Sequence, residues 1–329
     1  MDKGNQKLGI FLSFSLIKVS KVILFLLIEL SIKIESLYNL AYICIRYFLK
    51  PKNIIMLKNR KLLIDQDCPM CNIYGKCFSK IGLIDKNTIS PYQTIHDFHA
   101  NQIDMERAKN EIALLDTETS TTHYGIDAMI EIVAHRSVFL KKTLHSKLIY
   151  AFLLRLYRFI SYNRKVIYPT LKNKESRDCT PELNKKYRWT YILFVAVFTG
   201  LVLNQFAFHL NTRLGWEHNW VREFIICFGQ IGWQMTAIYF FKKDKTLEYL
   251  GNMSTVSMIG GLLLLPVLLA NYYFPISLIG LMAMFGIVVS IMFLEHIRRC
   301  KLLGVPFAMT ISWVGFRTVA LGIILWLMV

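Results

Sequence analysis

The second half of the chain contains five apolar runs that are long enough to cross a lipid bilayer. A helix needs about 20 apolar residues to span the hydrocarbon layer. The runs cover residues 190–210, 224–241, 253–273, 275–294 and 307–328. Most of them lack the polar stripe of a helix that packs on a soluble core, and the mean hydropathy of the whole chain is +0.39. We therefore expect an all-α transmembrane region of about five spans at 189–329, which excludes a purely soluble or disordered protein.

The loops between these runs alternate between basic and uncharged or balanced composition. The basic residues are Lys185, Lys186, Arg188, Lys242, Lys243, Lys245, Arg298, Arg299 and Lys301. Because basic loops favour the cytoplasmic side, residues before 190 are expected in the cytoplasm and Val329 outside. The expected localisation is that of an integral protein of a bacterial cytoplasmic membrane.

The formal net charge of +17 raises the question of a nucleic-acid partner. A basic pI near 9.5 would suit one, but no recognised nucleic-acid-binding motif accompanies the charge. Basic residues beside apolar spans usually contact the anionic lipids of the cytoplasmic leaflet. We expect anionic membrane lipids as a partner and no nucleic acid.

Residues 1–56 form a separate apolar and basic segment. Its runs at 8–17 and 22–32 are each too short to span a bilayer. Joining them would put Lys18 and Lys21 in the middle of the membrane at a cost of a few kcal/mol each. An interfacial or membrane-associated helix is therefore expected.

Residues 57–136 have the pattern of a compact α/β domain. The pattern predicts strands at 61–65, 87–92, 111–116 and 121–124, and helices at 69–82, 105–110 and 126–135. The order is strand, helix, strand, helix, hairpin, helix. In outline this order predicts a small thioredoxin-like domain.

The residues with reactive chemistry follow the first predicted strand, in the sequence Cys68-Pro69-Met70-Cys71. A cysteine at a helix start lies beside unpaired N–H groups and the positive end of the helix dipole, which favour the thiolate. The second cysteine lies one turn inward, within reach to close a disulfide. Cys68 is therefore expected to attack a substrate disulfide or sulfenate, and Cys71 to resolve the mixed disulfide.

The side chains near the two cysteines could serve the chemistry or only the structure. Asp65, at the end of the strand, could shuttle a proton for Cys71 or fix the turn. Asp67 is expected to cap the helix. Cys77 could regulate the pair, but it is expected to pack as a small apolar residue. A zinc site is the chemical alternative, because Cys68 and Cys71 with His96 and His99 form a Cys2His2 set.

Three sequence elements resemble a known family. The string LLIDQDCPMC is similar to the DxxCxxC signature of the DCC family of predicted thiol-disulfide oxidoreductases. Gly125-Ile126-Asp127-Ala128 resembles its G-x-D-A element, and Tyr157–Arg164 resembles the Y-x-x-x-x-x-N-R segment that closes the domain. The resemblance covers roughly 57–165 and implies a thioredoxin-like fold, Cys68 and Cys71 as the redox pair, and Asp65 as the signature acid.

The connector 137–188 carries 13 Lys+Arg against 3 Asp+Glu. Its apolar residues Leu144, Leu148, Phe152, Leu156 and Phe159 repeat at helical spacing. Such a helix would lie on an anionic membrane surface or pack against the α/β domain. Either arrangement would hold the dithiol close to the bilayer.

These observations predict a membrane-anchored thiol-disulfide oxidoreductase, an enzyme that needs no cofactor. Its partner would be a protein disulfide or a thiol electron carrier. The alternative is a transporter or scaffold whose small domain is a redox sensor or a structural zinc site. The polar residues within the spans that bear on it are Asn204, Gln205, Gln230, Gln234 and Arg317.

Overall fold

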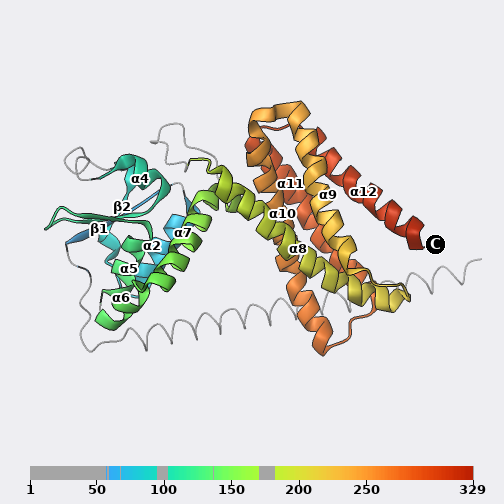
Figure 1. Ribbon diagram of the computed structural model, residues 1–329, viewed down its shortest axis with the longest axis horizontal. Coiled ribbons are helices and arrows are strands. Elements are labelled where there is room, and N and C mark those ends of the chain that lie inside the picture. Colours follow the sequence, from blue (N-terminus) through green and yellow to red (C-terminus); the bar gives the residue numbers. More distant parts are fainter. Residues whose placement is uncertain are drawn as a thin grey trace, which may run out of the picture.

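In the computed structural model of the protein, the described residues are 57, 59–66, 68–94, 103–135, 137–169 and 182–328. The segment 1–56 lies outside them, as do Asp67, His96 and His99. The described chain is mostly helical and includes one small mixed sheet (Figure 1). The expectation of a small α/β part followed by an all-helical part is confirmed at this level.

The sheet has four strands in the order β2-β1-β3-β4. The strands are β1 (Arg60–Ile64), β2 (Ile89–Pro91), β3 (Ala113–Asp116) and β4 (Thr122–Tyr124). β1 is parallel to β2, with Leu62 opposite Ile89, while β3 is antiparallel to both β1 and β4. The sheet therefore joins one strand–helix–strand unit to one hairpin.

Helices cover both faces of this sheet (Figure 1). They are α2 (Pro69–Lys80), α4 (Met105–Asn110) and α5 (Gly125–Ala134), with short η1 (Lys86–Thr88) and η2 (Tyr92–Thr94) around β2. Side chains alternate along β1, so that Leu62 and Ile64 pack with α2 and α5, whereas Leu63 packs with α4. α2 ends two residues before the predicted boundary, ahead of Gly82, whose φ is 72°.

The connector forms α6 (Val138–Leu144) and α7 (Lys147–Ile167). One side of α7 packs against α5 through Leu153, Leu154 and Tyr157. The middle of the predicted apolar stripe is uncovered, since Leu148 is 86% and Phe152 is 64% exposed. α7 therefore packs on the α/β domain through one face and leaves a second apolar face free within the described chain.

The remaining helices form a bundle (Figure 1). They are α8 (Lys185–Leu214), α9 (Trp220–Lys242), α10 (Thr246–Tyr273), α11 (Leu278–Leu303) and α12 (Ala308–Met328). Four helical segments of the described chain are long and apolar enough to cross a membrane: Lys185–Leu214, Trp220–Tyr273, Leu278–Leu303 and Ala308–Trp326. The second holds both α9 and α10, which the short η3 (Lys243–Lys245) joins. A membrane protein is supported, and the predicted count of five spans is not confirmed.

Two of the basic loops meet at one end of the bundle. Lys242 donates a hydrogen bond to the carbonyl of Gly304 at 2.5 Å, and Lys245 donates to that of Leu303 at 2.6 Å. Lysines there stabilise the negative end of the α11 dipole. The alternating charge pattern thus corresponds to a real clustering of basic loops, while the side of the membrane that they face remains a prediction.

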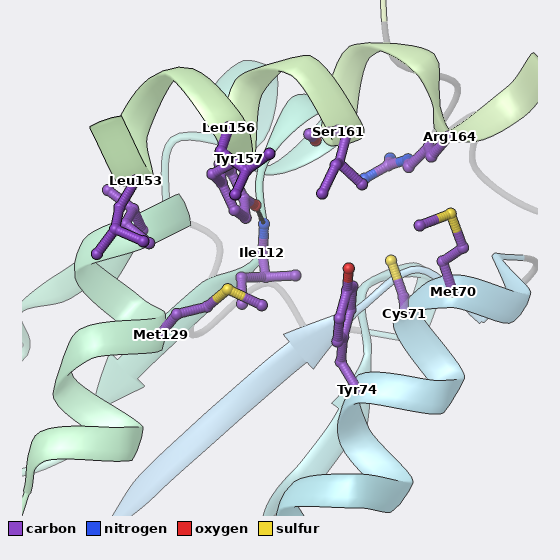
Figure 2. Close-up of a pocket in the computed structure, with 12 residues that line it drawn as sticks. Met70, Cys71, Tyr74, Ile112, Met129, Leu153, Leu156, Tyr157, Ser161 and Arg164 are labelled. Carbon is purple, nitrogen blue, oxygen red and sulfur yellow. Dashed lines mark hydrogen bonds between the residues drawn. The ribbon is translucent and has the colours of Figure 1, made fainter. Parts of the chain in front are cut away.

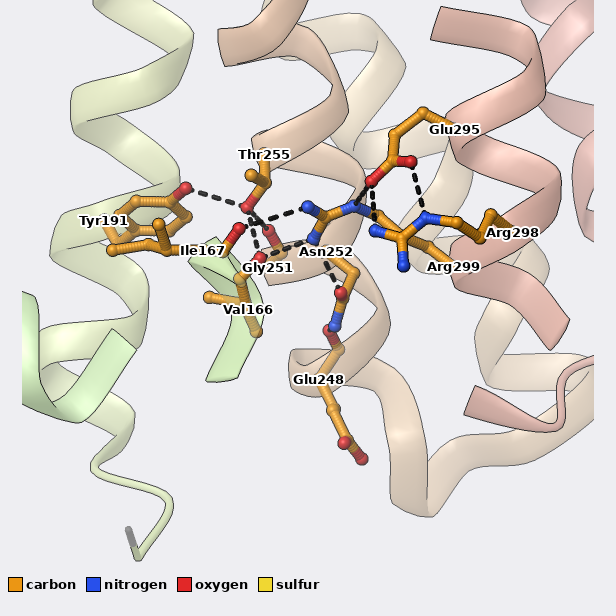
Figure 3. A network of polar contacts seen from close by, with 10 residues as sticks. All are labelled: Val166, Ile167, Tyr191, Glu248, Gly251, Asn252, Thr255, Glu295, Arg298 and Arg299. Atoms are coloured by element: carbon orange, nitrogen blue, oxygen red, sulfur yellow. Dashed lines mark hydrogen bonds and ion pairs between the residues drawn. The ribbon is translucent and has the colours of Figure 1, made fainter. Parts of the chain in front are cut away.

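The same end of the bundle holds the C-terminus of α7 (Figure 3). Arg299 of α11, which is 3% exposed, donates to the carbonyls of Val166 and Ile167 and to the side chain of Asn252. Thr255 of α10 also donates to the Val166 carbonyl, at 2.9 Å. The last carbonyls of a helix have no partner within it, so the bundle supplies the C-terminal cap of α7 and fixes the helix in place.

Candidate functional site

The two cysteines lie at the N-terminus of α2. Cys68 is the N-cap residue and Pro69 occupies the first turn, where the missing N–H of proline would have had no helical partner. The N–H of Cys68 donates to the carbonyl of Asp65 at 3.1 Å, which turns the chain from β1 into α2. Both cysteines are free thiols, and Cys68 and Cys71 are 4% and 3% exposed.

The two thiols differ in their affinity for a proton. The pKa of Cys68 is lowered to about 6, chiefly because the Cys71 thiol donates a hydrogen bond to its sulfur. The positive charge of Arg164 adds to this effect, while burial and the Asp65 carboxylate oppose it. The pKa of Cys71 is raised, because its proton is held by the Cys68 sulfur and because the thiol is buried. These changes favour the thiolate form of Cys68 and the protonated form of Cys71 at neutral pH.

Asp65 lies directly after β1 and is 6% exposed. Its Oδ1 accepts a hydrogen bond from Nε2 of Gln93 at 2.8 Å, and Oε1 of Gln93 accepts one from the backbone N–H of Gln66 at 3.1 Å. Its Oδ2 lies 3.8 Å from Nη2 of Arg164. Asp65 therefore holds the turn together, and its charge also raises the pKa of both thiols.

Arg164 reaches the site from α7. Its Nη2 donates to the carbonyl of Lys109 at 2.6 Å. One helical turn earlier, Ser161 donates to a backbone carbonyl at the end of α4, and the Tyr157 hydroxyl accepts a hydrogen bond from the N–H of Ile112 at 3.0 Å. These contacts fasten α7 to the end of α4 and to the residues just after it, and they hold the buried guanidinium of Arg164 near the dithiol.

The glycine of the Gly125–Ala128 segment is required where α5 begins. Gly125 has a φ of 59°, and a Cβ there would lie 2.8 Å from Oε2 of Glu111 and 3.1 Å from the ring of Tyr157. A side chain would therefore be strained and would displace α7. The three segments on which the family resemblance rests thus pack around one another.

An apolar cavity of about 270 Å³ lies between α2, α5 and α7. Its lining is Met70, Cys71, Tyr74, Ile112, Ile126, Met129, Leu153, Leu156, Tyr157, Ile160, Ser161 and Arg164. Figure 2 shows Cys71 and Tyr74 rising from α2 toward α7, with Arg164 near one end. Burial raises the pKa of Tyr74, so its hydroxyl stays protonated. The dithiol is therefore bordered by a space that suits an apolar side chain or a small apolar molecule.

One prediction about the neighbouring residues is wrong. Cys77 was expected to pack as an apolar residue, but it is exposed. The buried residues of α2 are Cys71, Gly75 and Phe78, and at about 100° per residue position 77 falls outside that face. The predicted cap Asp67 lies outside the described residues, and Cys68, the N-cap residue of α2, makes no capping hydrogen bond through its side chain.

The zinc alternative stays a prediction. His96 and His99 lie outside the described residues. Within the described ranges, no group of three or more His, Cys, Asp or Glu side chains is arranged to hold a metal ion.

Two residues of the site were not given a role from the sequence. Arg164 is the last residue of the Tyr157–Arg164 segment, so the family resemblance is the sequence feature that could have indicated its role. Gln93 gives no sequence signal, because its contact with Asp65 depends on the pairing of β2 with β1.

Comparisons with protein-family models, with curated proteins and with solved structures found no match to this chain.

Proposed function

We propose that the protein is a membrane-anchored thiol-disulfide oxidoreductase similar to the DCC family. The observation that carries this proposal is the lowered pKa of Cys68 next to a protonated Cys71. A thiolate at a helix N-terminus with a second thiol one turn away is suited to disulfide exchange. The mixed sheet and the order of its elements support a thioredoxin-like domain.

The reaction proceeds in two exchanges. The Cys68 thiolate attacks one sulfur of a partner disulfide, forming a mixed disulfide and releasing the partner's other sulfur as a thiolate. Cys71 then loses its proton and attacks the Cys68 sulfur, which breaks the mixed disulfide and releases the second partner sulfur. The partner gains two electrons, and Cys68 and Cys71 are left joined by a disulfide. Reversal of the same steps oxidises a partner dithiol.

Asp65 receives the proton of Cys71 in the second exchange. Its carboxylate is buried with the two sulfurs and interacts electrostatically with both. A base is needed there because the pKa of Cys71 is raised and its thiol is a poor nucleophile until it is deprotonated. The contacts of Asp65 with Gln93 and Arg164 keep the carboxylate in position.

The partner is a protein disulfide or a thiol electron carrier. The electrons are carried by the sulfur pair, so the reaction needs no further cofactor. The apolar cavity beside Cys71 suits an apolar residue that flanks the reactive cysteine of such a partner.

The domain works close to the bilayer, on the cytoplasmic side. α7 carries the exposed Leu148 and Phe152 beside exposed basic residues such as Arg155. An apolar face with a basic flank binds anionic lipid surfaces. The cap that the bundle places on α7 keeps the dithiol near the membrane.

The test is the pH dependence of alkylation in the full-length protein in detergent. Iodoacetamide labels thiolates, and mass spectrometry separates the Cys68 and Cys71 peptides. The Cys77→Ser background removes a thiol that is exposed among the described residues. The labelling rate of Cys68 should rise with a midpoint near pH 6, while Cys71 should stay unlabelled up to alkaline pH.

A second experiment identifies the resolving thiol. Cys71→Ser should trap a mixed disulfide between Cys68 and a model disulfide such as oxidised glutathione, whereas Cys68→Ser should trap none. Equal labelling of Cys68 and Cys71 at every pH would contradict the assigned roles, as would a stable mixed disulfide at Cys71.

One observation favours the sensor alternative. Arg164 lies within one helical turn of Val166 and Ile167, whose carbonyls are bound by Arg299 of the bundle (Figure 3). A change in the redox state of the dithiol would therefore alter the contacts between α7 and the helical bundle. In that function the redox state would change a property of the bundle, and a Cys68→Ser, Cys71→Ser double variant would remove the redox dependence of that property.

A further inference from the structure

A partly buried positive charge lies on α12 of the helical bundle, and no carboxylate of the described residues is beside it. Arg317 is in the middle of α12, and its Nε atom is buried. Among the described residues, no Asp or Glu oxygen lies within 4.0 Å of its guanidinium. Its Cζ atom stacks 4.1 Å from the ring centre of Trp313, which is 1% exposed. A charged residue in a membrane span is costly, and it marks a functional site unless its charge is compensated.

Two further hydrogen-bond donors are buried around the same space. Gln230 of α9 is 5% exposed and Thr199 of α8 is 6% exposed. Nε2 of Gln230, Oγ1 of Thr199 and Nε of Arg317 have no hydrogen-bond partner in the part of the chain that the structure describes. A buried donor without an acceptor costs about 1–3 kcal/mol. Three of them lining one space indicate that something else supplies the acceptor.

The three residues line a single cavity of about 50 Å³ between α8, α9, α10 and α12. Ser254 and Ser257 of α10 and Cys227 of α9 complete its polar lining. Glu223 lies one turn before Cys227 on α9, but its Oε1 is paired with Arg222 at 2.8 Å. A space of this size holds a few water-sized particles, which is too small for a phospholipid headgroup.

We propose that this cavity binds a small monovalent anion of the halide class. The guanidinium supplies the charge, and the Gln230 amide and Thr199 hydroxyl supply donors, which together suit an acceptor with no protons of its own. A cation is disfavoured because Arg317 would repel it. The bound anion neutralises Arg317 within the bundle and gives the buried donors their acceptor. The site is independent of the dithiol, since its lining comes from α8, α9, α10 and α12 alone.

The experiment uses the full-length protein in detergent, transferred from sodium chloride into sodium gluconate at constant ionic strength. The melting temperature is measured while chloride or bromide replaces gluconate. A bound anion stabilises the native state by mass action, so the melting temperature should first rise and then level off as each halide saturates the site. Gln230→Leu should weaken the apparent affinity about tenfold or more, because it removes one hydrogen bond to a charged ligand.

Variants separate specific binding from a general salt effect. Arg317→Gln should abolish the halide dependence, and Lys301→Gln, which removes an exposed charge from α11, should leave it intact. If Arg317→Gln does not fold, the double variant Thr199→Val, Gln230→Leu takes its place. Equal melting temperatures of the wild type in chloride and gluconate would overturn the proposal. So would an unchanged halide dependence in the Arg317 variant, or in the double variant.

Discussion

The guanidinium of Arg164 lies 3.8 Å from the carboxylate of Asp65, and both side chains are buried beside the dithiol. The two charges act on the sulfurs in opposite directions, since Arg164 lowers the pKa of Cys68 and Asp65 raises it. The pair is also held by neutral contacts, to Gln93 on one side and to the carbonyl of Lys109 on the other. Removing either charge should therefore move the reactivity of Cys68 in a defined direction.

Replacing Arg164 by glutamine should raise the pKa of Cys68. A positive charge within a few Å typically lowers the pKa of an acid by about one to three units, so the midpoint of Cys68 alkylation should move up by about one pH unit. At pH 7 the labelling rate should fall accordingly. Arg155→Gln, an exposed arginine on the same helix, is the matched control and should leave the midpoint unchanged.

Replacing Asp65 by asparagine should separate its two roles. Asparagine keeps an acceptor for Gln93 but loses the negative charge, so the pKa of Cys68 should fall further. Without a base for Cys71, closure of the disulfide from a Cys68–glutathione mixed disulfide should slow about a hundredfold or more. Stopped-flow quenching followed by mass spectrometry measures that rate. An unchanged closure rate would leave Asp65 with only its role in the turn.

The sequence predicted the site's centre better than its surroundings. The position of Cys68 and Cys71 at a helix start followed from a strand pattern, a proline and the cysteine spacing, all within residues 60–71. The contacts of Arg164 and Arg299 join segments far apart in the sequence, and no local pattern encodes them. The exposure of Cys77 could have been predicted from the sequence, because helical periodicity on α2 places it away from Cys71 and Phe78.

The same distinction applies to the membrane part. Hydropathy predicted where the long apolar helices lie, because each needs a run of apolar residues. Hydropathy could not predict that Gln230 and Arg317, on α9 and α12, line one cavity, since that depends on how the helices pack. On α7, the spacing of apolar residues predicted the stripe that includes the exposed Leu148 and Phe152. It did not predict the face that packs on α5 through Leu153 and Tyr157.

Enlarging Gly251 should loosen the junction between α7 and the bundle. A Cβ at this position of α10 would lie 2.7 Å from Nη1 of Arg188 and 3.1 Å from Val166. Such overpacking costs about 1–3 kcal/mol, so Gly251→Ala should increase hydrogen exchange at the end of α7. Gly286→Ala, on α11 with open space around it, is the matched control. Unchanged exchange at α7 in Gly251→Ala would show that the junction adapts without cost.

The uncovered face of α7 should lie against anionic lipid. A fluorophore attached through Phe152→Cys, in the full-length protein in nanodiscs, should be quenched by lipids that carry a quencher near the headgroup. Quenching should be stronger with anionic lipid than with neutral lipid and should weaken at high salt. Ile73→Cys, on the exposed side of α2, serves as the control. Equal quenching at both positions would argue against a lipid contact of α7.

Glu131 should make stability depend on pH at the acid end. Burial opposes its charge, but hydrogen bonds from Lys141 and Arg60 prevail and lower its pKa to about 2. A lowered pKa stabilises the folded state above the unfolded value of about 4.3, and this stabilisation is lost as the pH falls toward 2. Glu131→Gln should therefore cost about 1 kcal/mol at pH 7 and nothing near pH 2. Denaturant titration at both pH values measures the difference.

The central claim is that Cys68 and Cys71 form a redox couple. The measurement that tests it most directly is a titration of the purified full-length protein across glutathione buffers, with alkylation mass spectrometry and zinc quantification on the same samples. The pair should open and close as a single two-electron couple in zinc-free protein, and Cys68→Ser should abolish the transition. Stoichiometric zinc, or a pair that stays open in the most oxidising buffer, would contradict it.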